Sequence, residues 1–250
     1  AEDDVPEQEA EFTILGMGKF GGFELNFSSD VDLIYFYSSD RGKTTGVNDP
    51  IRGIRNQISI HQYFAKLSEL ISKAIGQATE DGFVFRVDLR LRPEGNSGEM
   101  ANSIAAGEIY YESWGQSWER SAMLNARPVA GSKQLGEELL QRLEPFIYRR
   151  HLDYAMVDDN KIMRQKIDRS LTREKEGELN LKLGKGGIRE IEFFIQALQL
   201  INAGKKPGLR ERKSLKALQL LCAEDLITSE ERDNLIDAYR FLRTAEHRIQ

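Results

Sequence analysis

The sequence predicts an α+β fold, with a small mixed sheet and its helices followed by a helical domain. Every segment with a strand pattern lies within the first 92 residues, where short apolar runs are separated by turn signals. From Ser103 onward, the apolar residues recur mostly at helical spacing. We therefore divide the chain into an acidic tail or linker at residues 1–11, a mixed α/β domain at 12–130 and a helical domain at 131–250.

Three segments carry the predicted sheet. Residues 12–15 form a short apolar strand, and residues 20–27 then form a short helix or turn. Residues 30–38 form a second strand that opens on two aspartates. The clearest alternation of apolar and polar side chains spans residues 83–92, and Pro93 ends it because proline lacks a backbone donor.

The predicted helices begin between these strands. Asn48-Asp49-Pro50 offers a capping side chain followed by proline, which is typical of a first helical turn. The apolar stripe from Ile54 to Ile75 then follows helical spacing. Thr228 and Glu231 have the spacing of a capping box. Further helices are expected at residues 103–126, 133–150, 157–173, 187–203, 213–224 and 228–250.

Composition limits the classes of function. The 250 residues are 40% hydrophobic and 30% charged, with a net charge of −5 that creates no basic field for nucleic acid. No apolar run reaches the roughly 20 residues that a membrane-spanning helix needs, so we expect no membrane partner. A single cysteine, Cys222, excludes an intramolecular disulfide and fits a cytoplasmic protein.

Two aspartates mark the first candidate site. Asp30 and Asp32 are two residues apart on the predicted strand, so their side chains share one face. At about 4 Å and an effective dielectric near 20, two like charges repel by roughly 4 kcal/mol. The pair therefore calls for a cation, and carboxylate oxygens suit Mg²⁺ or Mn²⁺. Gly21 and Gly22 precede the pair and would let backbone approach a phosphate.

The alternating segment at residues 83–92 supplies a third carboxylate. Asp88 shares the polar face with Arg86, Arg90 and Arg92. An ordinary solvated strand face would explain this pattern equally well if it stood alone. Beside the first aspartate pair, it predicts a third metal ligand flanked by guanidinium groups that bind phosphate oxygens.

A second glycine cluster precedes the helix predicted at residues 187–203. Residues 184–187 contain three glycines and Lys185, and a helix start with nearby lysines can hold an anion. Arg189, in the first turn, is a further candidate phosphate ligand. The pattern is weak, since most glycine-rich turns are only turns, and Arg189 with Glu192 could equally form a surface ion pair.

Four blocks in this order resemble a known family, the bifunctional glutamine synthetase adenylyltransferase/adenylyl-removing enzymes of the nucleotidyltransferase superfamily. That superfamily is marked by two small residues, then Asp-x-Asp, then a later strand carboxylate. The resemblance extends from about residue 12 to 250. The blocks are residues 16–33, 86–93, 118–120 and 186–193.

This resemblance implies a function and roles for the residues. Residues 12–130 would be the catalytic domain, with Asp30, Asp32 and Asp88 as catalytic residues that hold Mg²⁺ or Mn²⁺. Gly21, Gly22 and Ser29 would contact nucleotide phosphate. Our inference from strand geometry adds Arg90 and Arg92 as ligands of inorganic phosphate.

The implied reaction is phosphorolysis, in which phosphate removes AMP from an adenylyl-tyrosine of glutamine synthetase and leaves as ADP. The motif at residues 24–29 and the block at 188–192 look more like the amino-terminal, adenylyl-removing half of the enzyme. The chain looks like a fragment of that half, and the full-length enzyme would also meet a nitrogen-signalling regulatory protein.

Three alternatives stay open at this stage. The first is that the chain corresponds to the adding half, which attaches AMP from ATP to glutamine synthetase. It could be a nucleotidyltransferase for another acceptor, or a non-catalytic regulatory module that keeps the fold. All three expected carboxylates are present, which argues against the last alternative.

Overall fold

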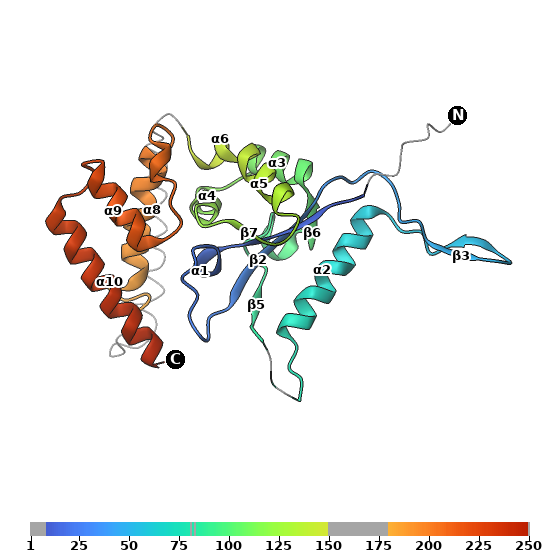
Figure 1. Cartoon of the computed structure of the whole chain (residues 1–250), viewed down its shortest axis with the longest axis horizontal. Coiled ribbons are helices and arrows are strands. Elements are labelled where there is room, and N and C mark those ends of the chain that lie inside the picture. Colours follow the sequence, from blue (N-terminus) through green and yellow to red (C-terminus); the bar gives the residue numbers. More distant parts are fainter. Residues whose placement is uncertain (1–8, 81, 83, 150–179, 250) are drawn as a thin grey trace.

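The computed structural model describes residues 9–80, 82, 84–149 and 180–249. These residues form a mixed sheet with helices on both faces, and a group of three further helices packs beside it (Figure 1). We call the described residues between 9 and 149 the sheet unit, and residues 180–249 the helical unit. The predicted α+β fold, with a small mixed sheet and helices, is confirmed.

Strand β2 (Val31–Tyr37) is the centre of the sheet. It pairs antiparallel with β1 (Phe12–Gly16), and β1 pairs antiparallel with β7 (Arg127–Gly131). The other edge of β2 is shared by two short parallel strands: β5 (Val87–Asp88) lies beside its start and β6 (Ala101–Ser103) beside its end. Asp32, the second residue of β2, therefore lies beside Asp88 of β5, and Asp30 comes directly before the strand.

Both faces of β2 are buried. Its odd-numbered residues pack with the apolar side of α2 (Ile60–Gly76), whereas Ile34 and Phe36 pack with α3 (Ile104–Ser113) and α5 (Lys133–Arg142). Successive strand residues point to opposite faces, so Asp32 lies on the same face as Ile34. The remaining short helices of this unit are α1 (Gly18–Gly21), η1 (Gly95–Ser97), α4 (Ser117–Met123) and α6 (Glu144–Ile147).

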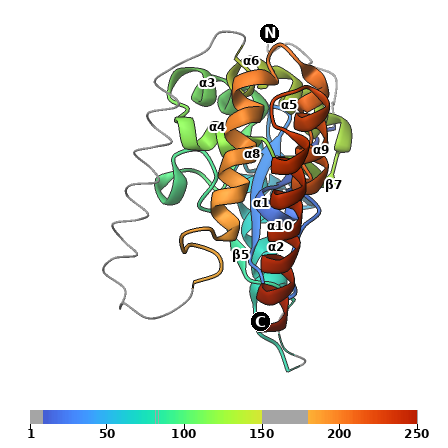
Figure 2. The ribbon, with the colours of Figure 1, turned by 90° about the vertical axis from the view of Figure 1, so that its left-hand side faces the viewer.

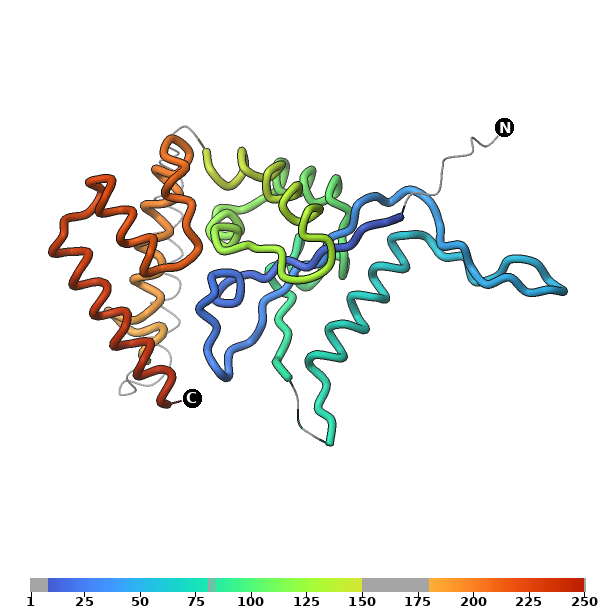
Figure 3. The backbone as a smooth tube through the Cα atoms, viewed as in Figure 1, coloured from blue at the N-terminus to red at the C-terminus, as the bar shows by residue number. Residues whose placement is uncertain are grey.

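The helix start predicted at Asn48-Asp49-Pro50 is wrong. These residues belong instead to a hairpin of β3 (Val47–Asp49) and β4 (Gly53–Arg55), which projects away from the rest of the chain (Figure 3). Asp49 accepts the backbone N–H groups of Ile51 and Arg52 at 2.9 and 3.0 Å, so the capping side chain closes a turn rather than opening a helix. Helix α2 begins at Ile60, and Ser59 caps it.

The long strand predicted at residues 83–92 is also wrong, because only Val87 and Asp88 pair with β2. The partner strand starts at Val31, so among the described residues of this segment Val84 and Phe85 have no strand beside them. After Asp88, its side chain accepts the backbone N–H of Arg90 at 2.9 Å and turns the chain away. The predicted common face for Asp88, Arg90 and Arg92 therefore does not form.

Two predicted helices are each interrupted once. The helix expected at residues 103–126 divides into α3 and α4 around Gly115, where a Cβ atom would lie 2.5 Å from the Phe146 ring. The helix expected at residues 133–150 divides into α5 and α6, because Pro145 has no N–H to continue α5 and starts α6.

The helical unit consists of α8 (Ile188–Asn202), α9 (Ser214–Ala223) and α10 (Ser229–Ile249), with the short turn η2 (Pro207–Leu209) between the first two. Figure 2 shows the three long helices side by side, and their apolar faces share one core. The helices predicted at residues 187–203, 213–224 and 228–250 are confirmed. The helix predicted at residues 157–173 lies outside the described residues.

The predicted capping box of α10 is confirmed. The Thr228 hydroxyl accepts the Glu231 N–H at 3.1 Å, and the Glu231 carboxylate accepts the Thr228 N–H at 2.8 Å. Helix α5 packs on β1 and β7, and α6 packs on α4 and α5. The division into domains at residue 130 stays a prediction. No helix in the described part of the chain is long and apolar enough to cross a membrane.

Candidate functional site

The structure brings Asp30, Asp32 and Asp88 together. Asp32 and Asp88 are partners in the parallel register of β2 and β5, and Asp30 lies two residues before Asp32. All three line a cavity of about 650 Å³ between the sheet unit and the helical unit. The three candidate catalytic residues therefore share one site, on which two packed units converge.

Asp32 lies in the most unfavourable environment of the three for a negative charge. Burial, and after it the nearby carboxylates of Asp88 and Asp30, raise its pKa to about 6. The cations of Lys182 and Arg90 oppose this shift but do not cancel it. A positive ion placed among these carboxylates would relieve the crowding.

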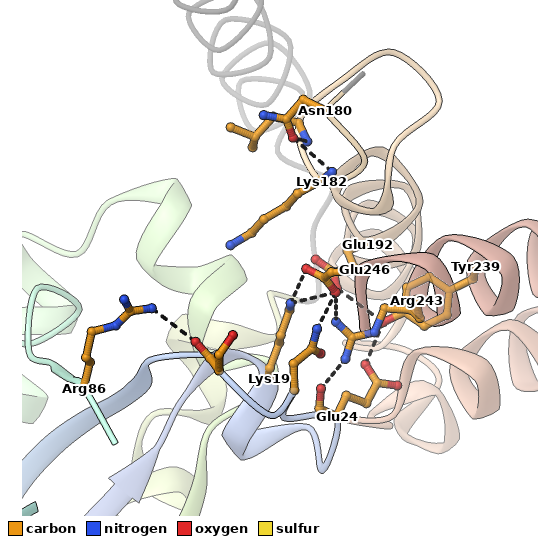
Figure 4. A network of polar contacts seen from close by, with 12 residues as sticks. Lys19, Glu24, Arg86, Asn180, Lys182, Glu192, Tyr239, Arg243 and Glu246 are labelled. Atoms are coloured by element: carbon orange, nitrogen blue, oxygen red, sulfur yellow. Dashed lines mark hydrogen bonds and ion pairs between the residues drawn. The ribbon is translucent and has the colours of Figure 1, made fainter. Parts of the chain in front are cut away.

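Two arginines neutralise the outer carboxylates. Arg86 Nε donates to Asp30 Oδ1 at 2.5 Å (Figure 4). Arg90 donates to both oxygens of Asp88, with Nε 2.9 Å and Nη2 2.5 Å from Oδ2. The hydrogen bonds from Arg90 outweigh burial and lower the pKa of Asp88. Both arginine side chains are largely exposed, at 67% and 72%, so these pairs can exchange partners.

The donor set fits a hard divalent cation. Three carboxylates supply only oxygen, which Mg²⁺ and Mn²⁺ prefer, and the raised pKa of Asp32 records the crowding that such an ion would relieve. Within the described residues, no three acidic, histidine or cysteine side chains form a ready-made metal cluster. The ion pairs of Asp30 with Arg86 and Asp88 with Arg90 explain this, since each turns one carboxylate toward a guanidinium.

The glycine next to the aspartates is Gly18, which the candidate residues chosen from sequence did not include. It has a φ of +51°, and a Cβ atom there would lie 2.9 Å from Asp32 Oδ2. Gly21 and Gly22 do not line the cavity; a Cβ atom on Gly21 would lie 2.0 Å from the Asn125 carbonyl oxygen. Gly21 therefore serves close packing, and the Gly-x-Gly spacing at residues 16–18 was the available signal for Gly18.

Arg127 fixes the loop that carries these glycines. Its guanidinium donates to the carbonyl oxygens of Phe20 at 2.9 Å and Gly21 at 3.1 Å, and it lies over the Phe23 ring at 3.9 Å. In the sequence block at residues 118–120, Glu119 is buried, and its carboxylate accepts a hydrogen bond from the Tyr110 hydroxyl at 2.9 Å. These contacts give both residues a structural role at the edge of the site.

Two of the predicted phosphate ligands lie elsewhere. Arg92 donates to the carbonyl oxygens of Leu89, Asn96 and Gly98 and does not line the cavity. Lys185 is exposed and does not line it either.

At the start of α8, where we predicted an anion-binding site, the backbone N–H groups already donate to carbonyl oxygens of the chain itself. The N–H groups of Ile188 and Arg189 donate to the carbonyls of Leu181 and Lys182 at 2.9 and 3.1 Å. These first-turn donors are therefore not directed toward a phosphate.

Ser29 and Arg189 do line the cavity, and their role in binding phosphate stays a prediction. The structure adds three cations there that sequence reasoning missed: Lys19 from the sheet unit, and Lys182 and Arg212 from the helical unit. Lys182 extends from its loop toward the space between Arg86 and Lys19 (Figure 4). The cavity is thus lined by both acidic side chains and cations, and each unit contributes to both groups.

The amino-terminal part of the chain matches a known family. The sequence model of the family described as glutamate-ammonia ligase adenylyltransferase covers residues 2–142. A second model, described as GlnD PII-uridylyltransferase, covers residues 161–250.

Curated relatives are 43–46% identical to this chain over 95–100% of its length. Three of them are each named bifunctional glutamine synthetase adenylyltransferase/adenylyl-removing enzyme. The relative from Pseudomonas aeruginosa is 46% identical over 95% of this chain and 23% of its own length. The corresponding values are 45%, 100% and 25% for Stenotrophomonas maltophilia and 43%, 99% and 24% for Rhodopseudomonas palustris. The chain spans about a quarter of the length of these relatives. Because the first family model covers more than half of the chain, the chain belongs to the glutamate-ammonia ligase adenylyltransferase family.

Proposed function

We propose that this chain removes AMP from an adenylyl-tyrosine of glutamine synthetase by phosphorolysis, with Mg²⁺ or Mn²⁺ as the cofactor. The observation that carries the proposal is the placement of Asp30, Asp32 and Asp88 in one cavity with cations from two units. The relatives' name supplies glutamine synthetase as the substrate and adenylyl removal as one of two activities. The residues at 24–29 and 188–192 favour the removing activity.

The three carboxylates would hold the cation. A divalent ion bound there would neutralise charge on the phosphates and stabilise the attacking and leaving oxygens. The chain's own task is then to exchange the partners of its carboxylates. To bind the ion, Asp30 and Asp88 would have to release Arg86 and Arg90, and each guanidinium would then be available to bind phosphate oxygens.

The reaction balances without a further reactant. An oxygen of inorganic phosphate forms a bond to the AMP phosphorus, and the bond from that phosphorus to the tyrosine oxygen breaks. The products are ADP and tyrosine, whose oxygen takes the proton that the phosphate brings. Arg90, Arg189 and Ser29 line the cavity and would orient the two phosphates, while Lys182 faces the same space.

The test is to incubate the chain with adenylylated glutamine synthetase, phosphate and Mg²⁺ and to measure ADP. ADP should form only when phosphate and the metal are both present, and EDTA should abolish it. Asp32→Asn should form ADP about a thousandfold more slowly. A matched control is Asp237→Asn, which changes an exposed aspartate on α10.

The reverse assay separates the alternatives. The chain is given ATP and unmodified glutamine synthetase, and pyrophosphate is measured. Attachment of AMP without phosphate-dependent release of ADP would replace the removing activity by the adding one at the same site. Absence of both activities, together with no metal binding by calorimetry, would leave a regulatory module that keeps the fold.

A further inference from the structure

A carboxylate of the sheet unit holds the helical unit. Glu24 lies shortly after α1, and its Oε1 accepts the backbone N–H of Ser214 at 2.8 Å. Its Oε2 accepts the hydroxyls of Ser214 at 2.8 Å and Tyr239 at 2.9 Å. Ser214 is the first residue of α9. Glu24 therefore caps a helix from a distant part of the chain, where the helix dipole favours a negative charge.

A carboxylate of the helical unit makes the reciprocal connection. Glu246 of α10 accepts Lys19 Nζ at 3.0 Å and Asn26 Nδ2 at 2.6 Å, both from the sheet unit (Figure 4). Arg243 of the same helix donates to it at 2.8 Å and also to the backbone carbonyl of Glu24. Glu246 is only 7% exposed, and such a buried carboxylate with several charged donors is costly to leave unpaired.

These contacts lie at the edge of the cavity. Lys19, Glu24, Ser214 and Glu246 all belong to its lining. Tyr239 also donates to Glu192, a further lining residue, at 3.3 Å. The position of the helical unit on the sheet unit therefore determines the distance between its cations and the aspartates of the sheet unit.

We propose that Glu24 and Glu246 are positioning residues that form a latch: they seat the helical unit on the sheet unit and so complete the cavity for the nucleotide. The identity of the ligand rests on the proposed function. With the latch released, the sheet unit keeps Asp30, Asp32 and Asp88, but the cations of the helical unit move away from them.

Release should open the cavity only in part, because other contacts between the units remain. Asn125 Nδ2 donates to the carbonyl of Arg212 at 2.9 Å, and Arg210 pairs with Glu144 at 2.6 Å. Neither contact involves the latch. The opening is therefore a hinge-like movement of the helical unit and not its separation.

The experiment compares Glu24→Ala and Glu246→Gln with the wild type. The control is Glu230→Gln, an exposed acid on the same helix as Glu246. Hydrogen exchange at the backbone N–H of Ser214 should become faster in both latch variants. ADP affinity, measured by calorimetry well below the unfolding temperature, should fall about tenfold or more, since each variant loses charge-assisted hydrogen bonds. The control should match the wild type in both measurements.

Each outcome decides between the latch and an ordinary stabilising contact. A lower Tm with unchanged ADP affinity and unchanged exchange at Ser214 overturns the latch. If the wild type binds no ADP, the proposed function fails, and the exchange comparison alone then decides whether the latch exists. Should Glu24→Ala not fold, Glu246→Gln carries the test, because its amide oxygen still accepts from Asn26.

Discussion

Asp32 and Asp88 face each other as register partners on adjacent parallel strands, yet their pKa values move in opposite directions. Burial and the neighbouring carboxylates raise the pKa of Asp32, whereas the guanidinium of Arg90 lowers that of Asp88. Within the described part of the chain, Asp88 forms an ion pair with Arg90, whereas no ion pair is found for Asp32. This asymmetry makes Asp32 the residue on which an added cation would act most strongly.

Asp32→Asn should stabilise the metal-free protein at pH 7. The folded pKa of about 6 lies above the ordinary value of 3.8, so the folded state binds the proton more tightly than the unfolded state. Stability contributed by protonated Asp32 is complete below pH 3.8 and is lost as the pH rises through 6. The difference corresponds to about 3 kcal/mol as an upper bound, and we expect about 2 kcal/mol.

The measurement is urea unfolding of both proteins in EDTA at several pH values. The increase in the free energy of unfolding of Asp32→Asn over the wild type should be present at pH 7 and vanish near pH 3.5. A gain of the same size at both pH values would show that ionisation of Asp32 is not its cause. Together with the loss of ADP formation proposed above, the result would show stability given up for function.

Asp88→Asn should lower the pKa of Asp32 without restoring its ordinary value. The carboxylate of Asp88 raises this pKa, but burial is the larger cause and remains in the variant. NMR titration of the Asp32 carboxyl carbon in metal-free protein would follow the change. An unchanged midpoint would mean that the two carboxylates do not interact, despite their register.

Gly21→Ala should destabilise the protein by several kcal/mol, about 3 or more. A Cβ atom there would lie 2.0 Å from the carbonyl oxygen of Asn125 and 2.4 Å from that of Gly16, and backbone cannot move aside as a flexible side chain can. Gly208→Ala is the control, because nothing lies within 4 Å of its Cβ position. Equal Tm values for the two variants would exclude the packing role.

The sequence was sufficient where one local pattern determines the result. The capping box at Thr228 and the apolar stripes of α8, α9 and α10 need only neighbouring residues, and these predictions are confirmed. The shared face of Asp30 and Asp32 follows from strand geometry alone. It placed two of the three carboxylates correctly in the same cavity.

The sequence-based predictions are wrong where the local structure depends on residues that are distant in the sequence. The alternation at residues 83–92 predicts a strand, but a strand needs a partner, and β2 offers one only beside Val87 and Asp88. Local patterns likewise cannot predict the side-chain contacts between the sheet unit and the helical unit. Lys19 and Glu246 are 227 positions apart in the sequence, and Glu24 and Ser214 are 190 positions apart. A lone acidic residue on a helix does not indicate which distant cation it will meet.

The shortened strand gives Arg90 and Arg92 different roles, which mutation can separate. Arg90 lies beside Asp88 at the cavity and is exposed, so Arg90→Ala should weaken the use of phosphate about ten- to a hundredfold with little change in stability. Arg92 instead holds three backbone carbonyls of its loop. Arg92→Ala should cost about 1–2 kcal/mol of stability and leave the use of phosphate by the folded protein unchanged.

The two variants are compared by their KM for phosphate in the ADP assay and by their Tm. Arg90→Ala should raise KM at an unchanged Tm, and Arg92→Ala should lower Tm at an unchanged KM. Arg90→Lys is the conservative control, since it keeps a positive charge but loses the paired donors that contact both oxygens of Asp88. A raised KM in Arg92→Ala with wild-type Tm would return that arginine to the phosphate site and require the loop after Asp88 to rearrange in the working enzyme.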